Sequence, residues 1–179
     1  MSRLLPPNLQ QHQGRLRPMA LTLHTLDTLA GWLIVALLGA MVAVVSLQVV
    51  LRYGLNSSIG FADELARLTF VWSIFLGIPL GIRIGSHIGI ELLTARLPDV
   101  VQDALLRAMA LAAAAMMVLV AWQSALMALD QWDELMISMD ASAGWFLVAV
   151  GVGCAHSALH LIWIALTGKP KNTETAATE

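Results

Sequence analysis

The sequence predicts an all-α membrane protein with four transmembrane helices in a single membrane domain, residues 1–179. Of its residues, 58% are hydrophobic and only 12% are charged, whereas roughly a quarter of the residues of a soluble domain carry charge. Four apolar stretches, each long enough to cross a bilayer, alternate with short polar segments. The single cysteine, Cys154, excludes an internal disulfide framework.

The first two predicted spans are residues 30–51 and 65–82. The first has 22 residues without a charge, about 33 Å of helix, which suffices for a hydrocarbon core of about 30 Å. A segment rich in glycine, asparagine and serine follows it and predicts a turn. The second span contains Pro79, which predicts a kink. Residues 1–18 are polar and predict a tail, with a helix starting near residue 19.

The second half of the chain predicts two further spans, residues 108–129 and 141–167. Residues 83–98 are too charged to cross, and their apolar residues recur about every four positions, which favours an amphipathic segment lying along the membrane interface. An alanine-rich run in the third span predicts close helix packing. Residues 168–179 form a short polar tail.

The distribution of basic residues predicts that both termini are cytoplasmic. Positive charge accumulates on the cytoplasmic side of membrane proteins. Only Arg52 and Arg67 fall in or beside the first and third connections. Eight basic residues fall in or beside the tails and the second connection: Arg3, Arg15, Arg17, Arg83, Arg96, Arg107, Lys169 and Lys171.

The stretch from residue 52 to residue 98 is the chemically densest part of the chain. Asp63 and Glu64 open the second span, where a helix N-terminus favours negative charge. Arg67 follows about one turn later, so an ion pair on one helical face is available. One interpretation is a charge cluster that merely ends two helices. The other is that it fixes the angle between the first two spans and offers a docking patch.

The order of residues in this stretch resembles the small integral-membrane subunit of tripartite ATP-independent periplasmic (TRAP) transporters. No single motif is specific, but the order and spacing together are. The resemblance covers about residues 45–100. A tryptophan common in that family just before the acidic pair is replaced here by Phe61 and Ala62. The matching residues are Arg52, Tyr53, Asp63, Glu64, Trp72, Gly77, Arg83, His87, Ile88, Leu97 and Pro98.

The resemblance implies a scaffold or accessory subunit of the bacterial inner membrane, without catalytic residues or a cofactor. Its expected partners are a large membrane permease subunit, membrane lipid and, indirectly, a periplasmic solute-binding protein. The large subunit would carry out sodium-coupled uptake of an organic acid-type solute. The residues expected at the partner interface or in a structural charge cluster are Arg52, Tyr53, Asp63, Glu64, Arg67, Trp72, Arg83 and His87.

The alternatives are a four-span accessory subunit of another complex, or a membrane haem or quinone-reactive cytochrome. His156 and His160 lie one turn apart on one helical face, so they cannot hold one iron from opposite sides. We therefore favour polar contacts between helices for this pair. The same spacing suits zinc, but the sequence offers no obvious third ligand, so no metal site is predicted. Scattered basic residues without interleaved loop aromatics give no support for nucleic-acid binding.

Overall fold

The prediction of four membrane-length helices is confirmed. The computed structural model describes residues 7–83 and 98–167. Each of its four long helices contains a segment long and apolar enough to cross a membrane. They are α1 (Pro7–Gly54), α2 (Ala62–Arg83), α4 (Asp99–Asp130) and α5 (Gly144–Thr167).

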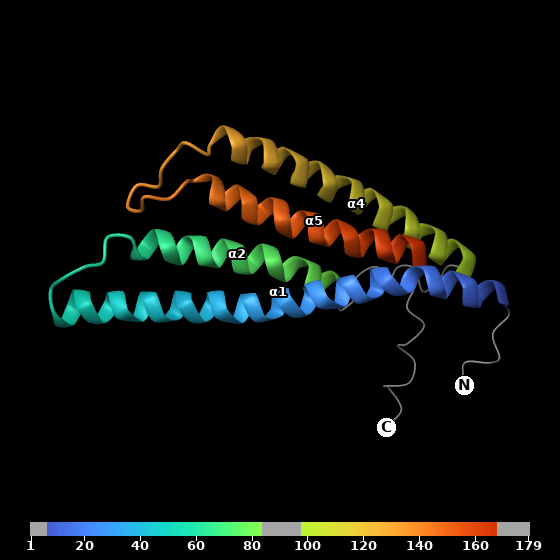
Figure 1. The fold of residues 1–179 in the computed structure, drawn as a ribbon, viewed down its shortest axis with the longest axis horizontal. Coiled ribbons are helices and arrows are strands. Elements are labelled where there is room, and N and C mark those ends of the chain that lie inside the picture. Colours follow the sequence, from blue (N-terminus) through green and yellow to red (C-terminus); the bar gives the residue numbers. More distant parts are fainter. Residues whose placement is uncertain (1–6, 84–97, 168–179) are drawn as a thin grey trace, which may run out of the picture.

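The helices form two antiparallel hairpins, α1 with α2 and α4 with α5, which meet where α2 packs against α5 (Figure 1). Across the bundle, the helices therefore lie side by side in the order α1, α2, α5, α4. We call the end with the connecting segments 55–61 and 131–143 the loop end. The opposite end, with Arg83, Asp99 and Thr167, is the basal end.

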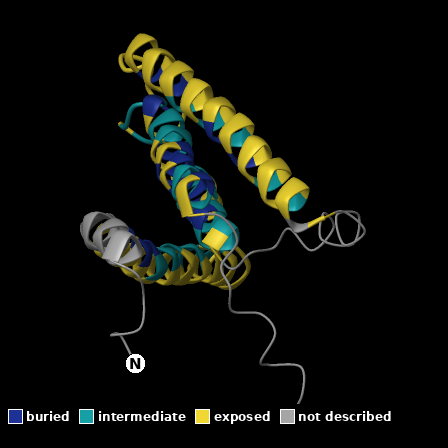
Figure 2. Ribbon diagram, turned by 90° about the vertical axis from the view of Figure 1, so that its right-hand side faces the viewer, coloured by how far each residue is buried: buried dark blue, intermediate teal, exposed yellow. Residues whose placement is uncertain are grey.

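Helix α1 packs through one narrow stripe of side chains. The spacing alternates between four and three residues, the pattern of helices that cross at a shallow angle as in a left-handed coiled coil. The other faces of its apolar segment are exposed, as they also are on α4 (Figure 2). The buried or half-buried positions of the stripe are Leu23, Asp27, Ala30, Ile34, Leu37, Met41, Val44, Gln48 and Leu51.

Small residues set the distances between the inner helices. Ala110 and Ala114 of α4 are buried, in agreement with the predicted packing role of the alanine-rich run, whereas Ala112 and Ala115 face outward. Where α5 crosses α2, a Cβ added to Gly153 would lie 2.8 Å from the backbone carbonyl carbon of Phe75. Such a separation is too short for a side chain, so only glycine fits at this crossing.

The helices extend beyond the predicted spans. The first helix begins at Pro7 rather than near residue 19, and α4 begins at Asp99, before the predicted span 108–129. A helix satisfies its own backbone hydrogen bonds, so it continues into polar sequence where the apolar segment has ended. In contrast, α5 begins at Gly144, three residues later than the predicted start at residue 141. The predicted interfacial segment after Arg83 and the polar tail at 168–179 lie outside the described residues.

Candidate functional site

A buried polar cluster lies near the basal end, where three helices meet. Asp27 comes from α1, Arg83 is the last residue of α2, and His156 and His160 come from α5. Nε2 of His160 lies 2.8 Å from Oδ1 of Asp27. The other carboxylate oxygen, Oδ2, accepts a hydrogen bond from Nη1 of Arg83 at 3.2 Å. We call these four residues the basal cluster.

The helix geometry explains why these side chains converge. Asp27 occupies the inward stripe of α1, between Leu23 and Ala30, so its carboxylate faces the protein rather than the lipid. His156 and His160 are separated by four residues and therefore project from the same face of α5. Their ring centroids are 5.1 Å apart. Both rings consequently reach the same carboxylate.

Burial makes this cluster chemically unusual. The Asp27 side chain is 3% exposed, and those of His156 and His160 are 9% and 7% exposed, whereas Arg83 is 51% exposed. Nε2 of His156 lies 3.2 Å from Oδ1 of Asp27, outside hydrogen-bonding geometry. It is thus a buried nitrogen with no hydrogen-bond partner among the described residues. Such groups are rare because burying them unpaired costs about 1–3 kcal/mol.

At the loop end, Glu64 joins the two hairpins. Its Oε1 and Oε2 accept hydrogen bonds from the backbone N–H groups of Ile137 and Ser138, each at 2.8 Å. These two amides lie at the tip of the segment between α4 and α5. The segment is itself closed by hydrogen bonds from Met136 N–H to the Ala141 carbonyl and from Ala143 N–H to the Glu134 carbonyl. We call this contact the Glu64 clamp.

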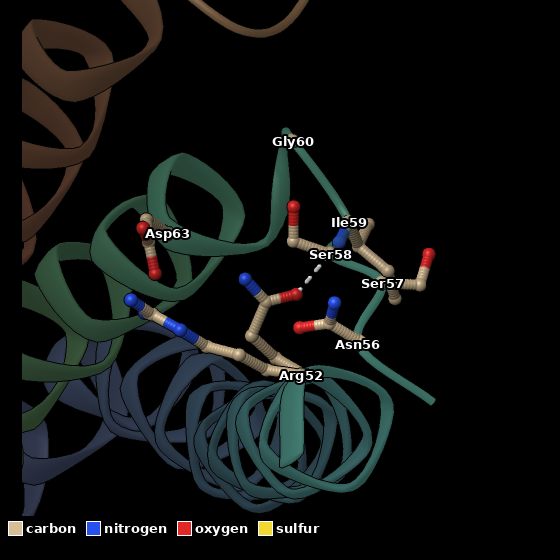
Figure 3. A pocket seen from close by; sticks show the side chains of 8 residues that line it. Arg52, Asn56, Ser57, Ser58, Ile59, Gly60 and Asp63 are labelled. Carbon is tan, nitrogen blue, oxygen red and sulfur yellow. Dashed lines mark hydrogen bonds between the residues drawn. The ribbon is translucent and has the colours of Figure 1, made fainter. Parts of the chain in front are cut away.

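A polar depression of about 430 Å³ lies beside the Glu64 clamp, between the end of α1 and the start of α2. Figure 3 shows Arg52 and Asp63 pointing toward one another on one side of it. Oε1 of Gln48 accepts a hydrogen bond from the Ile59 N–H at 2.9 Å and fixes the connecting segment. The lining residues are Gln48, Arg52, Asn56, Ser57, Ser58, Ile59, Gly60 and Asp63.

Three tryptophans connect α2, α5 and the loop-end segment. The ring centroids of Trp72 and Trp145 are 6.5 Å apart, and those of Trp132 and Trp145 are 5.8 Å apart. Both pairs are tilted, an arrangement that aromatic rings favour. Trp72, expected at a partner interface, is therefore at least partly engaged within its own chain.

Comparison with known proteins assigns the chain to a family. The family model for the DctQ component of tripartite ATP-independent periplasmic transporters matches residues 41–168, which is more than half of the chain. The chain belongs to this family. The match covers α2, α4, α5 and the last part of α1. The resemblance seen in the sequence is thereby confirmed.

Two Haemophilus influenzae proteins, provisionally named TRAP transporter small permease proteins, are similar to this DctQ-family chain. One is 36% identical over 75 residues, which cover 42% of this chain and 47% of that protein. The other is 32% identical over 74 residues, covering 41% and 45%. The matched part thus spans about half the length of either relative.

The residues that were expected at the partner interface lie at two different ends of the molecule. Arg52, Tyr53, Asp63 and Arg67 are exposed near the loop end. Within residues 7–83 and 98–167, every ion pair involves Asp27, so Arg67 does not take up the available pairing with Asp63 or Glu64. Arg83 instead joins the basal cluster. His87 lies outside the described residues.

Sequence reasoning missed the central role of Asp27. A single charge close to the end of an apolar span resembles an interface residue, so Asp27 does not stand out in the sequence. One signal could have found it: Asp27 falls on the stripe with the four- and three-residue spacing of Leu23, Ala30 and Ile34. The predicted polar helix-to-helix contacts of His156 and His160 are confirmed by their approach to Asp27.

Proposed function

We propose that this chain is a small scaffold subunit that braces the large membrane permease subunit of a TRAP-type transporter in the bacterial inner membrane. In this proposal the large subunit carries out sodium-coupled uptake of an organic acid-type solute, which a periplasmic binding protein delivers. The chain itself performs no catalysis and has both termini in the cytoplasm. The basal cluster then lies toward the cytoplasm, and the Glu64 clamp toward the periplasm.

The observation that best supports a bracing role is the position of the buried acidic and basic groups. Among the described residues, the buried acidic and basic side chains are Asp27, His156 and His160, and all three lie in one cluster between the Gly153 crossing and the basal end. Transporters usually bind substrate and coupling ions near the membrane midplane. The middle of this bundle instead has close backbone packing at Gly153, which suits a rigid support better than a transport path.

The outward faces of α1 and α4 provide the surface for such a support. Valines on α1 are exposed to the extent of 64% at Val35 and 60% at Val42, and Leu119 on α4 is 64% exposed. In water, apolar faces of this length would promote association. We assign them to contact with lipid and with the large subunit.

Co-purification tests the bracing proposal directly. This chain, carrying an affinity tag, is coexpressed with the large permease subunit of the same transporter. Purification through the tag should recover both proteins in a fixed ratio. Proteoliposomes with both subunits and the binding protein should take up solute under an inward sodium gradient, and those without this chain should not. Isolation of this chain as a stable lone monomer despite coexpression would contradict the proposal.

Two variants can locate the contact face. Val42→Trp on α1 and Leu119→Trp on α4 add bulk at similarly exposed apolar positions, so neither should disturb the internal packing. If one face meets the large subunit and the other meets lipid, only one variant will lower the recovery of the complex. Equal recovery with wild type in both cases would exclude these two sites from the contact.

A topology assay tests the orientation independently. Reporter enzymes fused at Gln131 and at Asn172 should be found on opposite sides of the membrane, with Asn172 in the cytoplasm. A result with both on the same side would overturn the arrangement of termini without affecting the family assignment.

A further inference from the structure

Three potential metal-ligating side chains converge in the basal cluster. One ligand atom from each of Asp27, His156 and His160 lies within 4.8 Å of the other two, and all three residues are buried. We propose that these three side chains bind a divalent transition-metal ion of the zinc type. This inference concerns the chain itself and does not depend on a role in transport.

The distances fit a metal site that closes with small side-chain movements. Zinc lies about 2.0–2.2 Å from imidazole nitrogen and carboxylate oxygen, so neighbouring ligand atoms around a tetrahedral ion are about 3.3 Å apart. Here Oδ1 of Asp27 is 3.2 Å from Nε2 of His156 and 2.8 Å from Nε2 of His160. Increases of up to roughly half an ångström would bring these two separations to the tetrahedral value, and the three ligand atoms all lie within 4.8 Å of one another.

The donor set indicates which class of ion is expected. Two imidazole nitrogens and one carboxylate oxygen favour zinc and its neighbours in the first transition series over magnesium or calcium, which prefer oxygen-only shells. Three protein ligands leave a fourth tetrahedral position for water. The i, i+4 histidine pair supplies two ligands from one face of α5, and α1 supplies the third.

Arg83 occupies the place of an outer-shell partner. Its Nη1 donates to Oδ2 of Asp27, while Oδ1 of the same carboxylate faces the two histidines. Metal-binding carboxylates are commonly held in this way by a hydrogen bond to the oxygen that does not bind the metal. The half-exposed guanidinium also keeps its positive charge close to solvent, at 51% exposure, so charge repulsion with the ion is screened.

Nε2 of His156, which lies 3.2 Å from Oδ1 of Asp27 but makes no hydrogen bond, distinguishes a metal site from a simple hydrogen-bonded clasp. A clasp is already complete with His160 and Arg83 on the two oxygens of Asp27, and His156 then adds only an unsatisfied buried group. A metal ion gives that nitrogen a partner. It also ties α1 to α5, and hence one hairpin to the other, at the basal end.

The test uses the purified full chain in detergent, with any histidine tag removed. Calorimetric titration with Zn²⁺ should show one site per chain, and Co²⁺ in its place should give the visible absorption of a tetrahedral complex. His156→Ala and His160→Ala should each weaken Zn²⁺ binding by more than about 100-fold, because loss of an outer-shell partner alone costs about 10–100-fold. Arg83→Gln should weaken it by about 10-fold.

His24→Ala is the matched control, because His24 is an exposed histidine on α1 and its loss should leave the affinity unchanged. Binding that persists in both His156→Ala and His160→Ala, or the absence of any Zn²⁺ binding to wild type, would overturn the proposal. If the variants do not fold, X-ray absorption at the zinc edge of loaded wild type decides. Two imidazoles with oxygen ligands support the site, and a sulfur ligand or a shell without imidazole refutes it.

Discussion

The two ends of this molecule join the same pair of hairpins in different ways. At the loop end, one carboxylate, Glu64, accepts hydrogen bonds from two backbone amides on an exposed segment. At the basal end, the carboxylate of Asp27 is buried and meets three side chains with ionisable groups. Between the ends, α2 and α5 approach closely at Gly153.

The difference shows what each connection contributes. Water competes for the hydrogen bonds of the Glu64 clamp, so each is worth little, and the clamp mainly orders the segment that contains Ile137 and Ser138. The Asp27, His156 and His160 side chains of the basal cluster are buried, so losing one partner there leaves another buried polar group unsatisfied. We therefore expect the loop end to control local order and the basal end to control the stability of the whole bundle.

Replacement of Gly153 should have the largest effect on stability, because a side chain at this position would push the two hairpins apart. Gly153→Leu places side-chain atoms where the backbone of Phe75 lies, so we expect a loss of about 3 kcal/mol in the free energy of unfolding, or failure to fold. Denaturation of the detergent-solubilised protein measures it. Gly151→Ala, compared with Gly153→Ala, is the control, since a Cβ at Gly151 meets its nearest atoms at 3.7 Å. Equal losses in both variants would place the rigid crossing elsewhere.

Removal of Asp27 should have the next largest effect. Asp27→Ala leaves two buried histidines without their carboxylate, and we expect a loss of about 2 kcal/mol, below the 3–5 kcal/mol of a fully buried pair because Arg83 is half-exposed. The measurement uses a chelator, so that metal binding does not contribute. Asp103→Ala removes an exposed aspartate of α4 and should change stability by less than about 0.5 kcal/mol. A similar loss of stability in both variants would show that the basal cluster contributes no more to stability than an exposed aspartate does.

Changes at Glu64 should be smaller and local. Glu64→Ala removes both acceptors of the clamp, and we expect little change in overall stability because water replaces these exposed hydrogen bonds. Hydrogen exchange at the Ile137 and Ser138 amides should accelerate, as detected by mass spectrometry of a peptide spanning residues 134–140. Asp63→Ala, one position away and exposed, should leave that exchange unchanged. Unchanged exchange in Glu64→Ala would show that the clamp does not order the segment.

The sequence predicted the four membrane helices because span length and hydropathy are local properties. It could not predict their ends, because the helices continue through polar residues once the chain has left the apolar region, as α1 and α4 do. The order α1, α2, α5, α4 depends on packing, and small residues such as Gly153 acquire their meaning only when the neighbouring backbone of Phe75 is known.

The sites were predicted less completely for a related physical reason. His156 and His160 are four residues apart, so their shared face was visible in the sequence. Their partner Asp27 lies on another helix, and no spacing rule connects it to them. Glu64 was noted as a helix-terminal carboxylate. Its oxygens, however, accept hydrogen bonds from backbone amides more than 70 positions away. Contacts between helices that are distant in sequence require the tertiary structure.

The smallest expected effect concerns the turn that leads from α1 to the Glu64 clamp. Asn56 has a φ of 50°, in the left-handed region that asparagine and glycine tolerate and other residues adopt at a cost of about 1–2 kcal/mol. Asn56→Gly should therefore keep wild-type stability within about 0.5 kcal/mol, whereas Asn56→Ala should lower it by about 1 kcal/mol. Unfolding of both variants in detergent provides the measurement.

Since the turn sets where α2 begins, Asn56→Ala should also speed hydrogen exchange at Ile59, whose N–H donates to Gln48. Equal stability of the two variants would mean that the turn relaxes freely, and that the clamp alone positions the start of α2.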